Sequence, residues 1–356
     1  MRWSTLLNVV DCHAEGEVGK VVTGGIGDVP GETMFDKRLF LERHRDDIRK
    51  LLLFEPRGAP NHNANIILPS RNPAAQMGYV ILESTEYPPM SGSNTICVAT
   101  VLLETGILPM VEPVTELVLE APAGLIRVRC DCADGKVRRV RFTNQPSFVH
   151  HVQAPIELAG IGTLTVDVAY GGMTYVLADA AALGFALVPD EARDICGIGQ
   201  RIKAAADEQL TAVHPENGLI AGVTMAEITG PLHRTAEGVR ARNAVVVSPG
   251  RLDRSPCGTG TCARLAVMHA RGLIGPNEMF VHESVIGSRF ESVIEELATV
   301  GPFPAVVASV AGQAWITGLH QVGLDPSDPY PRGFTLADTW QEVRSAAAGE
   351  PVLGAG

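Results

Sequence analysis

A repeated motif is the feature of this sequence that most restricts how the chain can fold. The segments 89–108 and 255–274 correspond at a constant offset of 166 residues. In both, a proline lies close to a small side chain that carries a hydroxyl or a thiol, and glycine, further hydroxyl residues and an apolar stretch ended by glycine follow. The matching pairs are Ser91 with Cys257, Gly92 with Gly258, Ser93 with Thr259, Thr95 with Thr261 and Gly106 with Gly272. The chain of 356 residues is long enough for about two domains, and we expect one copy in each.

Each copy is predicted to be a glycine-containing turn that leads into an apolar helix. The first turn of a helix leaves backbone N–H groups unpaired, and the helix dipole adds partial positive charge there, so each helix start is a candidate anion-binding site. A thiol at such a position has a lowered pKa, which makes Cys257 a candidate base or nucleophile. Two such starts that face each other would hold one carboxylate and present Ser91 and Cys257 from opposite sides.

The alternative interpretation is that both segments are ordinary buried helices, capped by Ser or Thr and ended by glycine. For either segment alone, this alternative is the better one. The pairing favours a binding site, because helix capping does not require a matching Ser and Cys at the same offset. Cys97 and Cys262, deeper in the two helices, are expected to be unreactive core residues.

The rest of the sequence indicates a mixed α/β (α+β) fold. Helices are expected over 37–54 and 190–210. Strands are expected over the apolar or alternating runs 6–10, 19–26, 66–68, 77–83, 124–132, 136–142, 164–168 and 174–177. Asp134-Gly135 is a strong hairpin signal. We expect a first half over 1–160, with the tail 326–356 as a candidate addition to it, and a second half over 161–325.

Composition excludes several classes of function. Twenty-nine basic against 40 acidic side chains give a net charge of −11, and no basic run exists. Binding to nucleic acid or to an anionic membrane surface is therefore not expected. No stretch of 18 apolar residues exists, and charged residues follow the amino terminus too early for a signal peptide, so a cytoplasmic location is expected. Seven scattered cysteines do not form a disulfide framework.

Metal and nucleotide signals in the sequence are incomplete. Cys130 and Cys132 lack a second cysteine pair that would finish a zinc site. His13, Glu15 and Glu17 are better interpreted as a polar corner near a cleft than as metal ligands. The glycines of 24–27 lack the rest of a dinucleotide-binding fingerprint. We expect neither a metal ion nor a cofactor.

The segment 252–261, Leu-Asp-Arg-Ser-Pro-Cys-Gly-Thr-Gly-Thr, resembles the signature of the proline racemase superfamily. The segment 11–25 is similar to the family's amino-terminal His-x-Glu-Gly-Glu and Val-x-Thr-Gly-Gly elements. Further similarity lies at 169–172, 242–243 and 284–288, so the resemblance runs from about residue 8 to about residue 320. It implies a diaminopimelate-epimerase-like fold, in which two similar halves each wrap a sheet around a central helix and the active site lies in the cleft between them.

The resemblance also implies a mechanism without a cofactor. Racemases and epimerases of the family use two cysteines as acid and base on opposite faces of the substrate α-carbon. Cys257 matches the second cysteine, whereas Ser91 takes the place of the first. The family pattern makes Ser91 the proton acceptor and Cys257 the donor, but a thiol is the stronger base, so the direction stays open.

The exchange of cysteine for serine favours a dehydratase. Reversible racemisation needs proton exchange on both faces, whereas loss of water from a 3-hydroxyproline needs one α-proton removed and the C3 hydroxyl expelled. We therefore expect a trans-3-hydroxy-L-proline dehydratase that forms Δ1-pyrroline-2-carboxylate, with 4-hydroxyproline 2-epimerase as a second activity. The alternatives are a 4-hydroxyproline 2-epimerase or proline racemase, and a non-catalytic imino-acid-binding protein.

The expected partner is a small imino acid, either hydroxyproline or proline, and a homodimer is an arrangement that the sequence leaves open. The substrate carboxylate is expected to accept hydrogen bonds from backbone N–H groups of Gly92, Ser93, Gly258 and Thr259. Asp253 is expected to bind the ring ammonium group. The alternative for Asp253 is a carboxylate that caps a turn.

Overall fold

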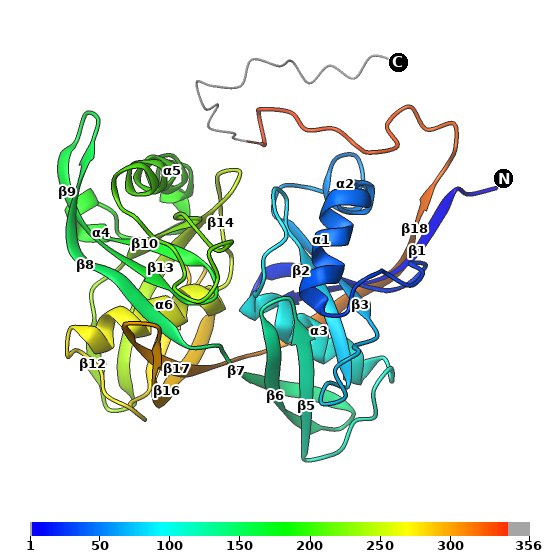
Figure 1. Ribbon diagram of the computed structural model, residues 1–356, viewed down its shortest axis with the longest axis horizontal. Helices are drawn as coiled ribbons and strands as arrows, with labels where there is room; N and C mark the ends of the chain where they lie inside the picture. The colour runs from blue at the N-terminus through cyan, green and yellow to red at the C-terminus, as the bar shows by residue number, and fades with distance from the viewer. Residues whose placement is uncertain (1, 341–356) are drawn as a thin grey trace.

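A long central helix lies at the heart of each of two similarly built halves (Figure 1). The computed structural model describes residues 2–340. Helix α3 (Gly92–Glu104) is buried along its whole length from Gly92 to Leu103, and helix α6 (Gly258–Ala270) is buried from Gly258 to Met268. A helix that is apolar on all sides is stable only when other elements surround it, and a mixed sheet wraps around each of these two.

In the first half, the sheet around α3 has the order β18-β1-β2-β3-β4-β5-β6-β7. The β2–β3 and β4–β5 pairs are parallel and the others are antiparallel. Its strands are β1 (Thr5–Ala14), β2 (Glu17–Gly24), β3 (His62–Leu68), β4 (Met77–Leu82), β5 (Val114–Ala121), β6 (Gly124–Ala133), β7 (Lys136–Thr143) and β18 (Ala314–Leu324). Helices α1 (Met34–His44) and α2 (Asp46–Leu53) cover the opposite face. Alternation along the strands supplies both faces: Val10 and Val21 pack toward α3, whereas Val9 and Val22 pack toward α1 and α2.

The second half repeats this plan around α6. Its strands pair in the order β8-β9-β10-β11-β13-β15-β16-β17, and β17 pairs again with β8 and so closes the ring. Helix α5 (Ala192–Gln209) packs on the outer face. The remaining elements are β8 (Ser147–Leu158), β9 (Gly162–Tyr170), β10 (Thr174–Asp179), α4 (Ala180–Leu183), the 3-10 turn η1 (Pro189–Glu191), β11 (Met225–Thr229), β12 (His233–Thr235), β13 (Gly238–Val247), β14 (Arg251–Leu252), β15 (Phe280–Glu283), β16 (Arg289–Val300) and β17 (Phe303–Gly312).

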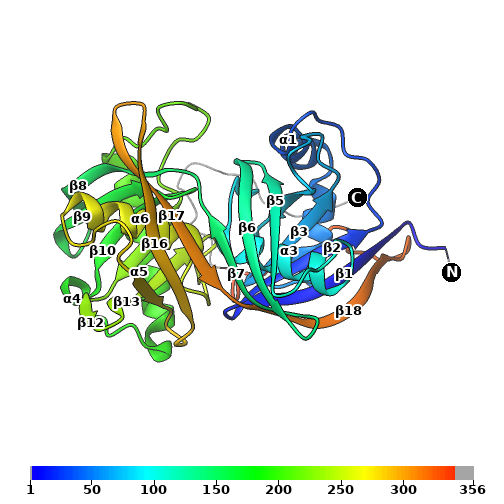
Figure 2. The same ribbon diagram turned by 90° about the horizontal axis from the view of Figure 1, so that it is seen from below.

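Strand pairing divides the chain differently from the expected ranges 1–160 and 161–325. Strand β8 pairs with β9 and β17 of the second half, and β18 pairs with β1 of the first. The chain therefore passes between the halves twice, between β7 and β8 and between β17 and β18 (Figure 2). We assign residues 2–144 and 314–340 to the first half and 145–313 to the second. Of the tail 326–356, residues 341–356 lie outside the described chain.

Most of the expected elements are present, with one division that the sequence did not predict. The hairpin at Asp134-Gly135 joins β6 to β7, and Glu15-Gly16 of the polar corner joins β1 to β2, whereas His13 and Glu17 lie within those strands. The helix expected over 37–54 is two helices, because the backbone of Arg45 leaves the helical region at φ −138° and ψ 33°. Two acidic residues, Asp46 and Asp47, then occupy the first turn of α2, where the helix dipole favours negative charge.

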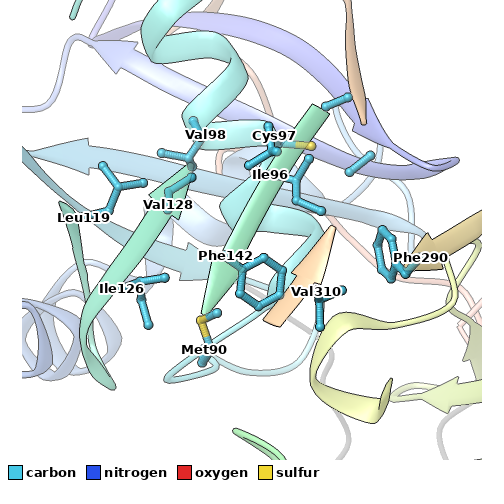
Figure 3. Packing of buried hydrophobic residues seen from close by; sticks show 14 of the residues in the cluster. Met90, Ile96, Cys97, Val98, Leu119, Ile126, Val128, Phe142, Phe290 and Val310 are labelled. Atoms are coloured by element: carbon cyan, nitrogen blue, oxygen red, sulfur yellow. The ribbon is translucent and has the colours of Figure 1, made fainter. Parts of the chain in front are cut away.

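The largest hydrophobic cluster surrounds α3 and continues into the second half (Figure 3). Phe142 of β7 and Phe290 of β16 are fully buried members of it, and each large apolar side chain buried in this way stabilises the fold by about 1.5–3 kcal/mol. Cys97 and Cys262 also belong to the cluster and are fully buried, which confirms their prediction as core residues. A continuous core holds the two central helices in a fixed relation, and that relation positions the site.

Candidate active site

The first residues of α3 and α6 lie against each other across the boundary between the halves. A Cβ atom placed on Gly92 would lie 2.7 Å from the Cα of Gly258, and one placed on Gly258 would lie 2.7 Å from the Cα of Gly92. Both would also crowd the ring of Phe142, so only glycine fits at either position. The residues just before these glycines, Ser91 and Cys257, are the N-caps of the two helices. The expectation that the two helix starts face each other is confirmed.

A small cavity lies at this meeting point, and the space next to its lining atoms, open solvent included, is about 370 Å³. All of the residues expected at the site from sequence lie on its wall: Ser91, Gly92, Ser93, Asp253, Cys257, Gly258 and Thr259. The wall also contains the apolar side chains Met90, Met173, Met225 and Val247. The cavity thus combines two helix starts with an apolar surface, which is the combination that a small ring with a carboxylate requires.

The sulfur of Cys257 has hydrogen-bonding neighbours on two elements. The hydroxyl of Tyr175 lies 3.2 Å from Sγ, and the N–H of Gly260 donates to Sγ at 3.4 Å. The same Tyr175 oxygen lies 2.6 Å from the hydroxyl of Thr259. The Cys257 backbone has a φ of 65°, which is strained for a residue with a side chain and is found preferentially at functional positions.

The environment of Cys257 corrects one expectation from sequence. Burial raises the pKa of the Cys257 thiol well above its ordinary value, and the nearby Asp253 carboxyl raises it further. The contacts of Tyr175 and Gly260 lower this pKa, but they do not compensate for the loss of water. The expected lowering of the thiol pKa is therefore wrong, because desolvation outweighs the effect of the helix start.

The hydroxyl of Ser91 has a different kind of partner. The side-chain amide of Asn94 donates to the Ser91 Oγ at 2.9 Å. Among residues 2–340, this is the one hydrogen bond of the Ser91 hydroxyl. Neither a histidine nor a carboxylate forms a hydrogen bond with it. An amide N–H cannot accept a proton, so nothing at this position activates Ser91 as a base in the way that a histidine activates a catalytic serine.

Three acidic side chains and one guanidinium group form the polar end of the cavity. Arg251 donates to Glu17 Oε1 at 2.7 Å and to Asn63 Oδ1 at 2.9 Å. Asp253 accepts from the backbone N–H and the hydroxyl of Ser255, both at 2.8 Å. Glu83 completes the group, and one of its carboxyl oxygens is buried without a hydrogen-bond partner among residues 2–340.

The three carboxyls at the polar end of the cavity are not matched by an equal number of positive groups. Burial, and after it the proximity of Glu17, raises the pKa of Asp253 to about 8, although Arg251 opposes both effects. Burial likewise raises the pKa of Glu83 to about 8, again opposed by Arg251. One guanidinium group does not neutralise three carboxyls, so this end of the cavity is suited to a bound cation such as an ammonium group.

Metal ligation has no support in the described part of the chain. No group of three or more His, Cys, Asp and Glu side chains among residues 2–340 is arranged to hold a metal ion. Of the corner residues His13, Glu15 and Glu17, only Glu17 lines the cavity, and His13 stacks on Trp315 with a ring-centre distance of 5.2 Å. No helix within the same range is long and apolar enough to cross a membrane.

The motifs and the geometry together agree with one family. The family model for proline racemase matches residues 9–335. The chain belongs to the proline racemase family. A hydroxyproline epimerase from Agrobacterium vitis, whose crystal structure contains trans-4-hydroxy-L-proline, is 39% identical with a TM-score of 0.89, over 96% of this chain and 98% of that chain.

Other solved structures extend the similarity of this proline racemase family member. A probable proline racemase from Agrobacterium radiobacter K84, with bound carbonate, is 38% identical with a TM-score of 0.88, over 94% of this chain and 98% of that chain. A predicted epimerase from Pseudomonas aeruginosa is 15% identical with a TM-score of 0.57, over 90% of this chain and the whole of that chain. The last similarity shows the fold alone, in agreement with the expected epimerase-like architecture.

Sequence reasoning missed several residues of the cavity wall. Arg251, Glu83 and Tyr175 lie far apart in the chain and meet only in the folded protein. A signal for Glu83 was present, because a carboxyl that directly follows the apolar run 77–82 is expected to be buried or functional. Tyr175 and Arg251 carried no comparable signal, since each lies in a strand of ordinary composition.

Proposed function

We propose that the protein is a trans-3-hydroxy-L-proline dehydratase that also epimerises 4-hydroxyproline at C2. The observation that carries this proposal is the inequality of the two side chains at the helix starts. Cys257 has a thiol that accepts a hydrogen bond from the N–H of Gly260 and lies 3.2 Å from the Tyr175 hydroxyl, whereas Ser91 has a hydroxyl that accepts from an amide and has no base beside it. One strong proton-handling group suits an elimination better than a symmetric racemisation.

The cavity complements each part of such a substrate. The N–H groups at the starts of α3 and α6 suit the carboxylate and would stabilise the negative charge that builds on it as the α-proton leaves. The ring ammonium group fits beside Asp253 and Glu83, and its positive charge there opposes the rise that Asp253 causes in the pKa of the Cys257 thiol. The ring carbons fit against Met90, Met173, Met225 and Val247.

Ser93 is a candidate for contact with the ring hydroxyl. Its side chain is buried, lines the cavity and has no hydrogen-bond partner among the described residues. Serine has a small side chain, so it leaves space for a ring substituent at this point of the wall. A hydroxyl donor or acceptor here suits a substrate that carries a ring hydroxyl.

The reaction balances without a further reactant. The α-proton leaves to the protein, and the electrons of the Cα–H bond form a double bond between Cα and C3. The C3–O bond breaks as this double bond forms, and the hydroxyl leaves as water because it receives a proton. The resulting enamine tautomerises to Δ1-pyrroline-2-carboxylate.

An epimerase activity is the second candidate, and a specific observation supports it. The Agrobacterium vitis structure is described as a hydroxyproline epimerase and contains trans-4-hydroxy-L-proline. This substrate has no C3 hydroxyl to lose, so removal and return of its α-proton can only regenerate it or invert C2. The same cavity then gives two different outcomes with two substrates.

An assay with two substrates tests the proposal. Trans-3-hydroxy-L-proline should yield Δ1-pyrroline-2-carboxylate, and trans-4-hydroxy-L-proline should yield cis-4-hydroxy-D-proline more slowly. The matched variant Ser91→Cys should raise epimerisation relative to dehydration by about tenfold or more, because a thiol returns a proton to C2 more readily than a hydroxyl does. Epimerisation without any pyrroline product would reject the dehydratase. Binding of pyrrole-2-carboxylate without turnover of any proline derivative would instead identify a binding protein.

A further inference from the structure

Ser91 lies at the end of a hydrogen-bond chain whose direction is set by a backbone carbonyl. The side-chain amide nitrogen of Asn65 donates to the carbonyl oxygen of Lys20 at 3.3 Å and to Asn94 Oδ1 at 2.7 Å. A carbonyl oxygen only accepts, so the NH2 group of Asn65 must point this way. Asn94 must then present its oxygen to Asn65 and its NH2 group to Ser91 Oγ, 2.9 Å away.

Packing fixes the hydrogen-bonded side chains of Asn65 and Asn94 in place. Asn65 and Asn94 are both fully buried, and the oxygen of Asn94 lies directly against β2, where a Cβ on Gly19 would approach it to 2.9 Å. Because Ser91 Oγ accepts a hydrogen bond from Asn94, the serine's own hydrogen is directed away from the amide. Ser91 lines the cavity, so this hydrogen is available to the substrate. The arrangement makes Ser91 a donor.

The sulfur of Cys257 has the opposite character. The N–H of Gly260 can only donate, and it points at the sulfur from 3.4 Å. The Tyr175 oxygen lies 2.6 Å from Thr259 Oγ1 and 3.2 Å from the sulfur, and its hydrogen reaches the sulfur when Thr259 is the donor of the shorter contact. The Gly260 contact opposes the rise in the Cys257 pKa that burial causes, and the ammonium group of a bound substrate opposes the part that Asp253 causes, so the sulfur accepts a proton once its thiol has ionised.

We propose that Asn94, fixed by Asn65, is a positioning residue that keeps Ser91 a proton donor, and that Cys257 removes the α-proton of the L-substrate. This inference rests on the proposed function and reverses the roles that the family pattern implies. In trans-3-hydroxy-L-proline, the α-hydrogen and the C3 hydroxyl lie on the same face of the ring. The ionised Cys257 takes the α-proton, the Cα=C3 double bond forms as the C3–O bond breaks, and the new thiol delivers that proton to the departing hydroxyl.

Dehydration therefore needs one proton-handling residue, and the thiolate is regenerated as water leaves. Epimerisation needs a second residue, because the proton must return to Cα from the opposite face. On that face Ser91 is the donor, and its ability to donate depends on Asn94. The two activities should consequently respond differently to changes at Ser91 and at Asn94.

Both activities are measured between pH 6 and 9 in wild-type enzyme, Ser91→Ala and Asn94→Asp. Ser91→Ala should lose epimerisation by about 100-fold or more and dehydration by far less. In Asn94→Asp, the ionised carboxylate accepts the hydrogen of Ser91, so epimerisation should fall as pH rises through the pKa of the new carboxyl. Dehydration should keep the shape of its wild-type pH profile. The double variant Ser91→Ala/Asn94→Asp should lack the new pH dependence.

Equal loss of both activities in Ser91→Ala would overturn the assignment of the base. Equal loss of both activities at every pH in Asn94→Asp would show a structural role alone. Wild-type enzyme that forms no pyrroline product rejects the proposed function only, and exchange of the α-hydrogen of trans-4-hydroxy-L-proline in D2O then decides the inference. Exchange that persists in Ser91→Ala and is lost in Cys257→Ala supports Cys257 as the base. Exchange that is lost in Ser91→Ala and persists in Cys257→Ala overturns this inference. Absence of exchange in the wild-type enzyme overturns both the inference and the proposed function.

Discussion

At the scale of single residues, the buried carboxyls of the cavity need either protons or a bound cation to balance their charge. Asp253 and Glu83 are buried carboxyls whose pKa values are raised to about 8, and their surroundings supply one positive group, Arg251. Such carboxyls bind protons near neutral pH in order to avoid an uncompensated buried charge. The ring ammonium group of an imino acid replaces those protons with a fixed positive charge.

The affinity for substrate should therefore depend on pH. Below about pH 8 the carboxyl pair of Asp253 and Glu83 holds protons that the ammonium group must displace, so substrate affinity should rise between pH 6 and 9, by up to about tenfold for each pH unit. Pyrrole-2-carboxylate has an uncharged ring nitrogen, and its affinity should not rise over this range. Calorimetric titration of Cys257→Ala with both ligands gives the two profiles.

Asp253→Asn is the matched variant for this prediction. It removes one of the two titrating carboxyls, so the rise in substrate affinity with pH should become shallower while pyrrole-2-carboxylate binding changes little with pH. Equal pH profiles for the charged and the uncharged ligand would contradict the role of these carboxyls.

At the scale of elements, the repeated motif determines the site. Gly92 and Gly258 occupy the same position in two helices and allow the helix starts to touch. The N-cap residues before them, Ser91 and Cys257, therefore line the same cavity. This part could be predicted because glycine, cap and helix are local in sequence. The role of Ser91 as a donor towards the cavity could not be predicted, because it depends on Asn65 and on a backbone carbonyl in another strand.

Enlarging one of the touching glycines should disable the site. The Cβ of Gly258→Ala would lie 2.7 Å from Gly92 and 3.1 Å from the ring of Phe142, so α6 must move away from α3. We expect a loss of about 1–3 kcal/mol in the free energy of unfolding. Turnover should fall by about 100-fold, because displacement of the reacting groups by about 1 Å has an effect of this size. Urea denaturation and the dehydration assay measure the two effects.

Gly197→Ala in α5 provides the control, because a Cβ there meets no atom within 4 Å. It should keep wild-type turnover and stabilise the protein by up to about 1 kcal/mol, as alanine generally does in a helix. Full activity in Gly258→Ala would show that close approach of the helix starts is not required for catalysis.

At the scale of the whole molecule, each half contributes one side of the cavity, and long-range contacts fix their relation. Arg251 of the second half is bound to Glu17 and Asn63 of the first, at 2.7 Å and 2.9 Å. Strand β17 pairs with β7 of the first half as well as with β8 and β16 of its own. The two-half plan could be predicted from the repeat, but the boundary could not. Pairing between strands more than 150 residues apart, such as β17 with β7, leaves no local signal in the sequence.

The arrangement of the two caps about a bound ligand tests the central claim most directly. A crystal structure with pyrrole-2-carboxylate, a planar mimic of the deprotonated substrate, should show the carboxylate accepting hydrogen bonds from N–H groups of Gly92 and Gly258. The ring should lie between the hydroxyl of Ser91 on one face and the sulfur of Cys257 on the other. A ligand bound outside this cavity, or with both side chains on the same face of its ring, would contradict the account.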